Sequence, residues 1–219
     1  MKRLISIFLF LVILFAGCVG SVGKTDNIDE IEENSYKVSN EISTDEEKVL
    51  LQIQNAIFDE FPLEASRITK SSGKNPTKTE LIEAMKIIGN KYQVPFEIIY
   101  GIGVGETGGY NGGVPCQFWS NGNPIVSGDN GIGMMQVTPW AISQNFDEYS
   151  LKYDWKYNLE AGAQVILSKW RYVEARNPIG DMNWKVLENW YMTLWAYNGL
   201  STITLMNTKM AQEHGIMDI

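Results

Sequence analysis

A chain of 219 residues with 44% hydrophobic residues can bury one substantial core, and this length argues against two large domains. The formal net charge is −8, and the basic residues form no cluster that could neutralise phosphates, which disfavours nucleic-acid binding. The acidity is concentrated in Thr25–Val49, where nine acidic residues accompany two basic ones.

The N-terminus has the features of an export signal. Two basic residues precede the mainly apolar stretch Leu4–Phe15, and two small residues stand directly before Cys18. This segment resembles a lipoprotein signal peptide spanning residues 1–17. The resemblance implies that Cys18 is lipidated and that the protein lies in the cell envelope, on the outer face of a membrane. The alternative is an uncleaved anchor, because the apolar stretch almost reaches the ~20 residues of a spanning helix.

The second cysteine is expected to be an ordinary packed thiol. If Cys18 carries a lipid, Cys116 has no partner for a disulfide. The only histidine, His214, is far away in sequence, so no neighbouring base is available to make Cys116 a nucleophile.

Residues 18–43 are polar and acidic and have no sustained apolar period, which is typical of a flexible tether. A helix is then predicted from Thr44, which forms a capping box with Glu47, until Pro62. The sequence leaves open whether this helix packs on the rest of the chain.

A linker follows this helix. Residues 44–76 are therefore assigned to the N-terminal helix and its linker, and 77–219 to the main domain. The capping box formed by Thr77 and Glu80 marks the start of the domain's first helix, with these apolar residues on one side: Leu81, Met85, Ile88 and Tyr92.

The next helix is predicted to begin at Pro95, and it carries a carboxylate near its end. Glu106 continues an apolar stripe formed by Phe96, Ile99 and Ile102. Partial desolvation on such a stripe raises the pKa of a carboxyl group, as a general acid requires. Three glycines in this helix, at 101, 103 and 105, indicate that another backbone or a ligand comes close to it.

Residues 108–130 form a long glycine-rich loop, a length typical of binding loops. Three further helices are predicted: a short one from Thr138, a longer one capped by Asn158, and a last one over Trp184–Tyr197. The inner face of the longer helix consists of Leu159, Ala163, Ile166, Leu167 and Trp170, and small residues around Gly162 predict close packing of two helices.

Three short motifs follow one another in the main domain: Gly105-Glu106-Thr107, Gly131-Ile132-Gly133-Met134-Met135-Gln136 and Ala196-Tyr197-Asn198-Gly199. In this order and spacing they resemble the lysozyme-like lytic transglycosylases and the related goose-type lysozymes, over roughly residues 81–200. The resemblance implies a mainly α, lysozyme-like domain with an irregular loop or small β region beside a substrate cleft.

The resemblance also implies a chemistry. Glu106 would act first as acid and then as base in cleaving the β-1,4 bond between N-acetylmuramic acid and N-acetylglucosamine, leaving a 1,6-anhydro end without using water. Peptidoglycan strands would be the partner, and no metal or cofactor is implied. The residues implied to contact the substrate are Thr107, Met134, Met135, Gln136, Tyr197 and Asn198.

Two alternatives remain open. Gly128-Asp129-Asn130-Gly131 resembles the loop of goose-type lysozymes, so Asp129 is a candidate second carboxylate for a hydrolase, which inverting hydrolysis would place about 6.5 to 9.5 Å from Glu106. Asp-Asn-Gly is equally a strong turn sequence. The chain could also be an envelope lipoprotein that binds glycan without cleaving it. The sequence identifies no protein partner.

Overall fold

The computed structural model describes residues 44–65, 73–138, 145–176, 178 and 180–197, and for residues 44–47 it describes only the backbone. Within these ranges the chain forms α-helices and no β-sheet, which confirms a mainly α fold. The α-helices are α2 (Thr44–Glu60), α3 (Lys78–Tyr92), α4 (Phe96–Thr107), α5 (Glu148–Tyr153), α6 (Trp155–Glu174) and α7 (Tyr191–Tyr197), and the 3-10 helices are η2 (Gly108–Tyr110) and η3 (Leu187–Trp190).

Several predicted features lie outside the described residues: the signal segment 1–17, Cys18 with the tether 18–43, the short helix after Thr138, Asn198 and His214. The side chains of the predicted capping box at Thr44 also lie outside them. None of the helices in the described ranges is both long and apolar enough to cross a membrane.

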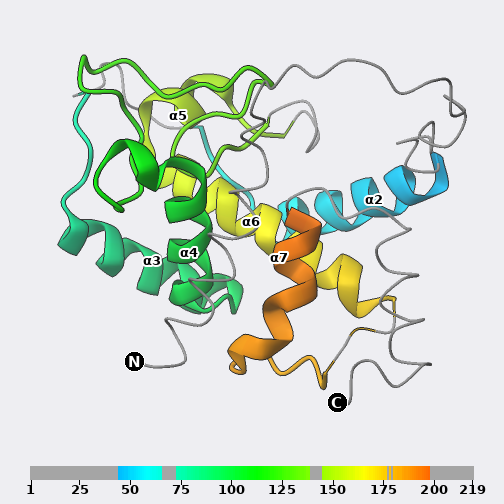
Figure 1. The fold of residues 1–219 in the computed structure, drawn as a ribbon. Coiled ribbons are helices and arrows are strands. Elements are labelled where there is room, and N and C mark those ends of the chain that lie inside the picture. The colour runs from blue at the N-terminus through cyan, green and yellow to red at the C-terminus, as the bar shows by residue number, and fades with distance from the viewer. Residues whose placement is uncertain (1–43, 66–72, 139–144, 177, 179, 198–219) are drawn as a thin grey trace, which may run out of the picture.

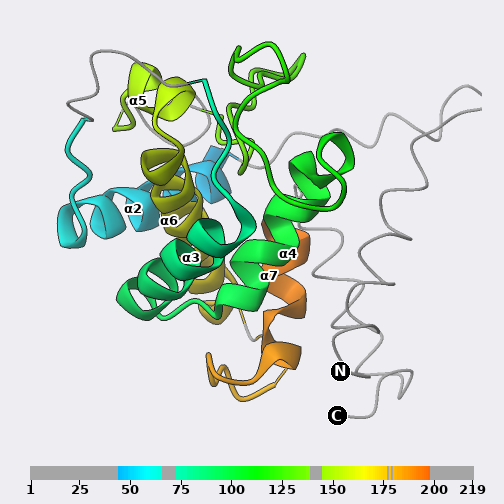
Figure 2. The ribbon, with the colours of Figure 1, turned by 90° about the vertical axis from the view of Figure 1, so that its left-hand side faces the viewer.

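Among the helices in the described ranges, α6 is the longest. It runs through the middle of this helical assembly and contacts the other five α-helices, as Figures 1 and 2 show. Its predicted inner face is buried, from Leu159 at 0% exposure to Trp170 at 7%. The centroid of the Trp170 ring lies 4.0 Å from that of the fully buried Trp190, which belongs to the same core.

Helices α3 and α4 begin where their local sequences predict. The Thr77 hydroxyl accepts a hydrogen bond from Glu80 N, and the Glu80 carboxylate accepts one from Thr77 N, so the capping box is present. The four apolar residues predicted for α3 are all buried. Gln93 ends α3 in a left-handed conformation at φ 55°, and Pro95 caps α4.

The first described helix, α2, packs against α6. Its Ile57 is only 1% exposed and belongs to the main core. Just after α2, the carbonyl oxygen of Phe61 accepts a hydrogen bond from Nε2 of Gln164 at 2.6 Å, and Arg171 pairs with Glu60 at 2.7 Å. The question that the sequence leaves open is therefore answered: α2 is part of the packed structure.

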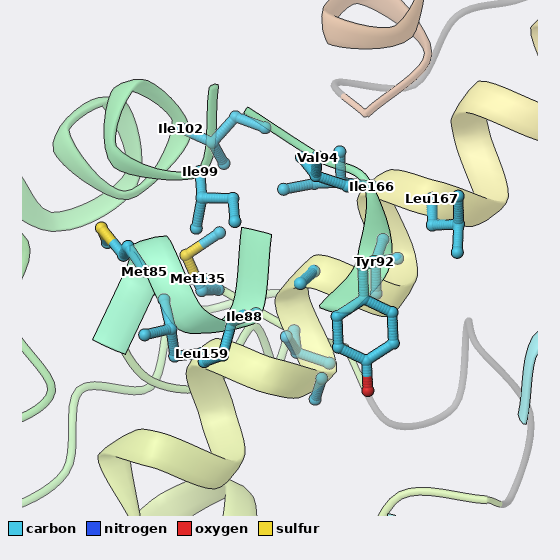
Figure 3. Close-up of a cluster of buried hydrophobic side chains, with 14 of the residues drawn as sticks. Met85, Ile88, Tyr92, Val94, Ile99, Ile102, Met135, Leu159, Ile166 and Leu167 are labelled. Carbon is cyan, nitrogen blue, oxygen red and sulfur yellow. The ribbon is translucent and has the colours of Figure 1, made fainter. Parts of the chain in front are cut away.

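The chain between α4 and α5 forms only isolated β-bridges within its described residues, and these link Phe118 with Pro124 and Ile132 with both Val126 and Val137. This long segment nevertheless contributes to the core. Figure 3 shows the Met135 side chain among residues of α3, α4 and α6.

Two predicted helix starts are wrong. The N-cap of α6 is Asp154, whose carboxylate accepts from Lys156 N and Tyr157 N, because the Asn158 side chain is hydrogen-bonded elsewhere. The last α-helix begins at Tyr191 rather than Trp184. Asn189 donates to Asp181 and to the backbone before η3, and such local bonds compete with a regular helix.

Helix α5 was not predicted. Asp147 caps it by accepting a hydrogen bond from Ser150 N at 2.7 Å, and the Asp147 N–H donates to the Tyr157 hydroxyl at 2.9 Å. With only six residues, α5 is too short for a periodic apolar pattern to stand out.

Candidate functional site

Glu106 lies in the last turn of α4, where its side chain is half-buried. Burial, and to a lesser extent the nearby negative charge of Asp129, together raise the pKa of Glu106 to about 7. Among the residues that the structure describes, none donates a hydrogen bond to this carboxyl group. The site therefore favours a protonated Glu106 near neutral pH, as the apolar stripe predicts.

Asp129 lies on an exposed turn that approaches Glu106. Its carboxylate accepts a hydrogen bond from the Ser127 hydroxyl, which lowers the pKa of Asp129. The same hydroxyl accepts from Gly131 N at 2.9 Å, and Asn130 adopts a left-handed φ of 66°. Asp129 is thus both a turn residue, as its sequence context predicts, and an ionised neighbour of Glu106.

Asp129→Asn should lower the pKa of Glu106, because it removes the negative charge that disfavours ionisation of the Glu106 carboxyl. The pKa should stay above the ordinary value of 4.5, because burial is the larger cause. A ¹³C NMR titration of labelled glutamate carboxyls, with the Glu106 signal assigned by its loss in Glu106→Gln, measures this. Asp181→Asn removes an exposed charge from another loop and serves as the control; an equal fall there would contradict the coupling.

At two positions of the 131–136 segment the neighbouring atoms leave no room for a Cβ, so glycine is required. A Cβ on Gly131 would lie 2.8 Å from Oε1 of Gln136, and one on Gly133 would lie 2.4 Å from Nδ2 of Asn158. Gly133 also has a positive φ of 71°, which only glycine adopts readily. The segment is therefore a tightly packed turn.

The helical glycines have different roles. A Cβ on Gly103 would lie 3.0 Å from the Pro115 ring, so a side chain, and not the backbone that the sequence suggests, comes close there. A Cβ on Gly101 would meet nothing within 4 Å, so no backbone approaches this glycine, and the approach of a ligand stays a prediction. Gly162 makes room for the Met135 side chain, which a Cβ would approach to 2.6 Å. The small residue serves a loop side chain rather than the expected second helix.

Three of the residues expected to contact a substrate have side chains in the core. Met134, Met135 and Thr107 are each 0% exposed. The Thr107 hydroxyl accepts from Cys116 N at 3.0 Å and lies 3.2 Å from the Gly103 carbonyl, to which it donates. The two methionine side chains are packed in the core, and the threonine hydroxyl is engaged in internal hydrogen bonds. None of the three side chains can therefore contact a ligand at the surface.

Gln136 keeps part of its hydrogen-bonding capacity. Its Nε2 donates to the carbonyl oxygen of Gly133 at 2.8 Å, and its backbone has a left-handed φ of 47°. Gln136 is half-buried, whereas Gly133, Met134 and Met135 are buried, so it is the member of this motif that stays partly accessible to solvent. A left-handed non-glycine residue costs backbone energy and is a feature found at functional sites.

Tyr197 is the last residue of α7, and its side chain is half-buried. Burial raises the pKa of Tyr197 well above its usual range, and the negative charge of Glu106 contributes in the same direction. The hydroxyl donates to the carbonyl oxygen of Met135 at 2.6 Å. The single phenol proton is therefore donated to the backbone and not to the Glu106 carboxyl in this structure. Its predicted neighbour Asn198 is outside the described residues.

Two residues that the sequence analysis missed hold the 131–136 segment in place. Oε1 of Gln117 accepts from Met134 N, and Oδ1 of Asn158 accepts from Met135 N, each at 3.0 Å. One signal for Asn158 was available: it shares a helix face with Gly162 and Ile166, and a polar residue on a buried stripe needs an internal partner. Gln117, in a loop, carried no comparable signal.

Cys116 is 1% exposed and unpaired among the described residues, and its thiol donates to the carbonyl oxygen of Thr107 at 3.4 Å. Burial raises its pKa, which disfavours the thiolate, in agreement with a packed thiol. In the described part of the chain, no three His, Cys, Asp or Glu side chains gather as a metal site would require.

We compared the chain with known protein-family models, with curated proteins and with solved structures, and none of them matches it.

Proposed function

We propose that this chain is a peptidoglycan lytic transglycosylase with a lysozyme-like domain. The observation that carries the proposal is Glu106: a half-buried carboxyl group at a helix end, with a pKa raised to about 7 and no hydrogen bond from the described residues. A carboxyl in this state can donate its proton near neutral pH and accept one afterwards. The three motifs that resemble those of lytic transglycosylases supply the substrate class.

In the proposed reaction Glu106 protonates the oxygen that links N-acetylmuramic acid to N-acetylglucosamine, and that bond breaks. The N-acetyl group of the muramic acid stabilises the resulting cationic carbon. The ionised Glu106 then takes the proton from the O6 hydroxyl of the same sugar, and O6 bonds to the anomeric carbon as a 1,6-anhydro ring. One carboxyl group performs both proton transfers, so no water, metal or cofactor enters.

The specific observation that favours a second candidate, a hydrolase, is the coupling between Asp129 and Glu106. An ionised Asp129 could activate a water molecule on the other side of the sugar from the acid, as inverting glycosidases do with paired carboxylates. Hydrolysis would then need Asp129, whereas transglycosylation would not.

A glycan-binding protein without activity is the alternative from another class. Such a protein gains nothing from a protonated acid beside the substrate, and burying a carboxyl without a hydrogen bond costs stability. Glu106 therefore argues for catalysis.

The proposed location is the cell envelope, with the domain held at the outer face of a membrane by a lipid on Cys18.

The test is mass spectrometry of the fragments that a soluble form lacking residues 1–18 releases from purified peptidoglycan. Anhydro-muropeptides are expected from the wild-type sequence and not from Glu106→Gln. Hydrated muropeptides that disappear in Asp129→Asn would establish the hydrolase instead. Binding without release by the wild-type sequence would leave the non-catalytic protein as the answer.

A further inference from the structure

Two aromatic side chains are exposed on the loop that follows Glu106. Tyr110 is 63% exposed and Trp119 is 38% exposed. Their ring centroids lie 4.7 Å apart, and the ring planes are tilted by 60° to one another. The two rings therefore form one continuous apolar surface, and we refer to them as the loop aromatic pair.

The loop aromatic pair lies near the proposed acid, because the chain itself limits the distance. Tyr110 is the last residue of η2, which directly follows α4, and it comes four residues after Glu106. Four residues span at most about 14 Å even when fully extended, and a 3-10 turn makes the path shorter. A strand of several sugar rings bound at Glu106 is therefore long enough to reach the pair.

The backbone that carries Trp119 is held by a side chain from another segment. Oδ1 of Asn75 accepts hydrogen bonds from Gln117 N at 2.7 Å and from Phe118 N at 2.8 Å, and its Nδ2 donates to the Phe118 carbonyl at 2.8 Å. Phe118 is 2% exposed, and successive side chains of an extended backbone point in opposite directions, which directs Trp119 outward. The indole is thus positioned before any ligand binds, which lowers the entropy cost of binding.

The surface around the loop aromatic pair is uncharged. Residues 108–128 contain no Asp, Glu, Lys or Arg. The exposed polar side chains of this loop are amides and a hydroxyl: Asn111, Ser120, Asn121 and Asn123. No basic group is present to bind a phosphate or an anionic lipid, and the net charge of −8 disfavours anions generally. A neutral ligand rich in hydroxyl groups matches this surface.

We propose that Tyr110 and Trp119 form a sugar-binding subsite for a neutral N-acetylhexosamine ring of the glycan strand, outside the bond that Glu106 cleaves. The apolar C–H face of the sugar packs on the rings. Its hydroxyl groups bond to the indole N–H and the phenol, which have no hydrogen-bond partner among the described residues. This inference rests on the proposed function, because it takes the glycan strand from it.

The test is isothermal titration calorimetry with chitohexaose, a soluble β-1,4-linked oligomer of N-acetylglucosamine. The full-length protein in detergent carries Glu106→Gln, so that binding is measured without cleavage. Trp119→Ala in this background should weaken binding at least about fivefold, because the indole supplies the larger apolar face. Trp119→Phe keeps an aromatic ring and should recover most of the affinity. Unchanged affinity in Trp119→Ala would overturn the inference, as would a lack of any binding before substitution.

Tyr149→Ala is the matched control. Tyr149 is 45% exposed, and its ring centroid lies 4.7 Å from that of Tyr153. Both belong to α5, which Figure 2 shows well apart from the end of α4. The affinity for chitohexaose should therefore stay the same. A loss equal to that of Trp119→Ala would mean that the sugar binds exposed aromatic rings without selection, and would overturn the subsite.

A second measurement covers the case in which Trp119→Ala fails to fold. The indole N–H signal of Trp119 in a ¹H–¹⁵N NMR spectrum is assigned by its loss in Trp119→Phe. This signal should shift as chitohexaose is added. Tyr110→Ala, which removes a mainly exposed side chain, should weaken the binding too. A Trp119 signal that stays fixed while the sugar binds would place the sugar elsewhere and overturn the inference.

The two proposals can fail separately. If peptidoglycan cleavage depends on Glu106 while Tyr110→Ala and Trp119→Ala change neither the affinity for chitohexaose nor the KM for glycan strands, the subsite is wrong and the function stands. If chitohexaose binds through the loop aromatic pair and the wild-type protein cleaves no glycan, the subsite is real and the proposed reaction is wrong.

Discussion

Replacing Glu106 by Gln should lower the rate of peptidoglycan cleavage by about 10²- to 10⁴-fold, the usual contribution of a general acid. The amide has nearly the same shape and cannot donate an acidic proton, so binding of the glycan should change little. Release of labelled muropeptides measures the rate, and co-sedimentation with insoluble peptidoglycan measures binding. Full activity in the variant would move the acid to another residue.

The same substitution should stabilise the fold at neutral and higher pH, which separates loss of chemistry from loss of structure. The folded-state pKa of Glu106 is about 7 against an ordinary 4.5. A raised carboxyl pKa means that the wild-type protein loses stability as pH rises through this window, because the folded state must ionise a buried group. Glu106→Gln removes that cost, which amounts to at most about 3 kcal/mol.

Urea unfolding at pH 4 and pH 8 tests this sign. The two proteins should be similarly stable at pH 4, where Glu106 is protonated, and the variant should be the more stable at pH 8. Glu83→Gln, which removes an exposed carboxyl from α3, should change stability by less than about 0.5 kcal/mol at either pH. A variant that is less stable at pH 8 than the wild-type protein would show that Glu106 is not in a desolvated site.

Gly133→Ala should destabilise the fold by about 3 to 5 kcal/mol, through two costs that add. The backbone has a φ of 71°, where a Cβ is strained. The Cβ would also lie 2.4 Å from Asn158 Nδ2 and from Gln117 Oε1, so one of these buried amides must break its hydrogen bonds. Chemical unfolding monitored by tryptophan fluorescence measures the loss.

Gly101→Ala is the matched control for Gly133→Ala. Gly101 lies within α4, and a Cβ there would meet nothing within 4 Å. Alanine in a helix should therefore raise stability by about 0.5 to 1 kcal/mol. Equal effects of the two substitutions would contradict the packing described around Gly133.

The helices of the core could be predicted because their signals are local. The capping box at Thr77 and the buried face of α6 each depend on residues within a few turns of one another, and the apolar stripe before Glu106 predicts its raised pKa. The start of α7 could not be found in this way, because side-chain bonds around Asn189 replace the helical ones. The packing of α2 on α6 likewise depends on contacts across about a hundred residues.

By itself, the sequence determined that the domain is mainly helical, that Glu106 ends an apolar stripe and that Asp129 stands in a turn. Only the tertiary structure decided what surrounds Glu106. It buried Thr107, Met134 and Met135, and it directed the Tyr197 proton to a backbone carbonyl. The physical reason is that burial and hydrogen-bond partners depend on which distant segments pack together: Gln117 and Asn158 reach the same turn from 17 and 23 residues away, and no local periodicity records such a meeting.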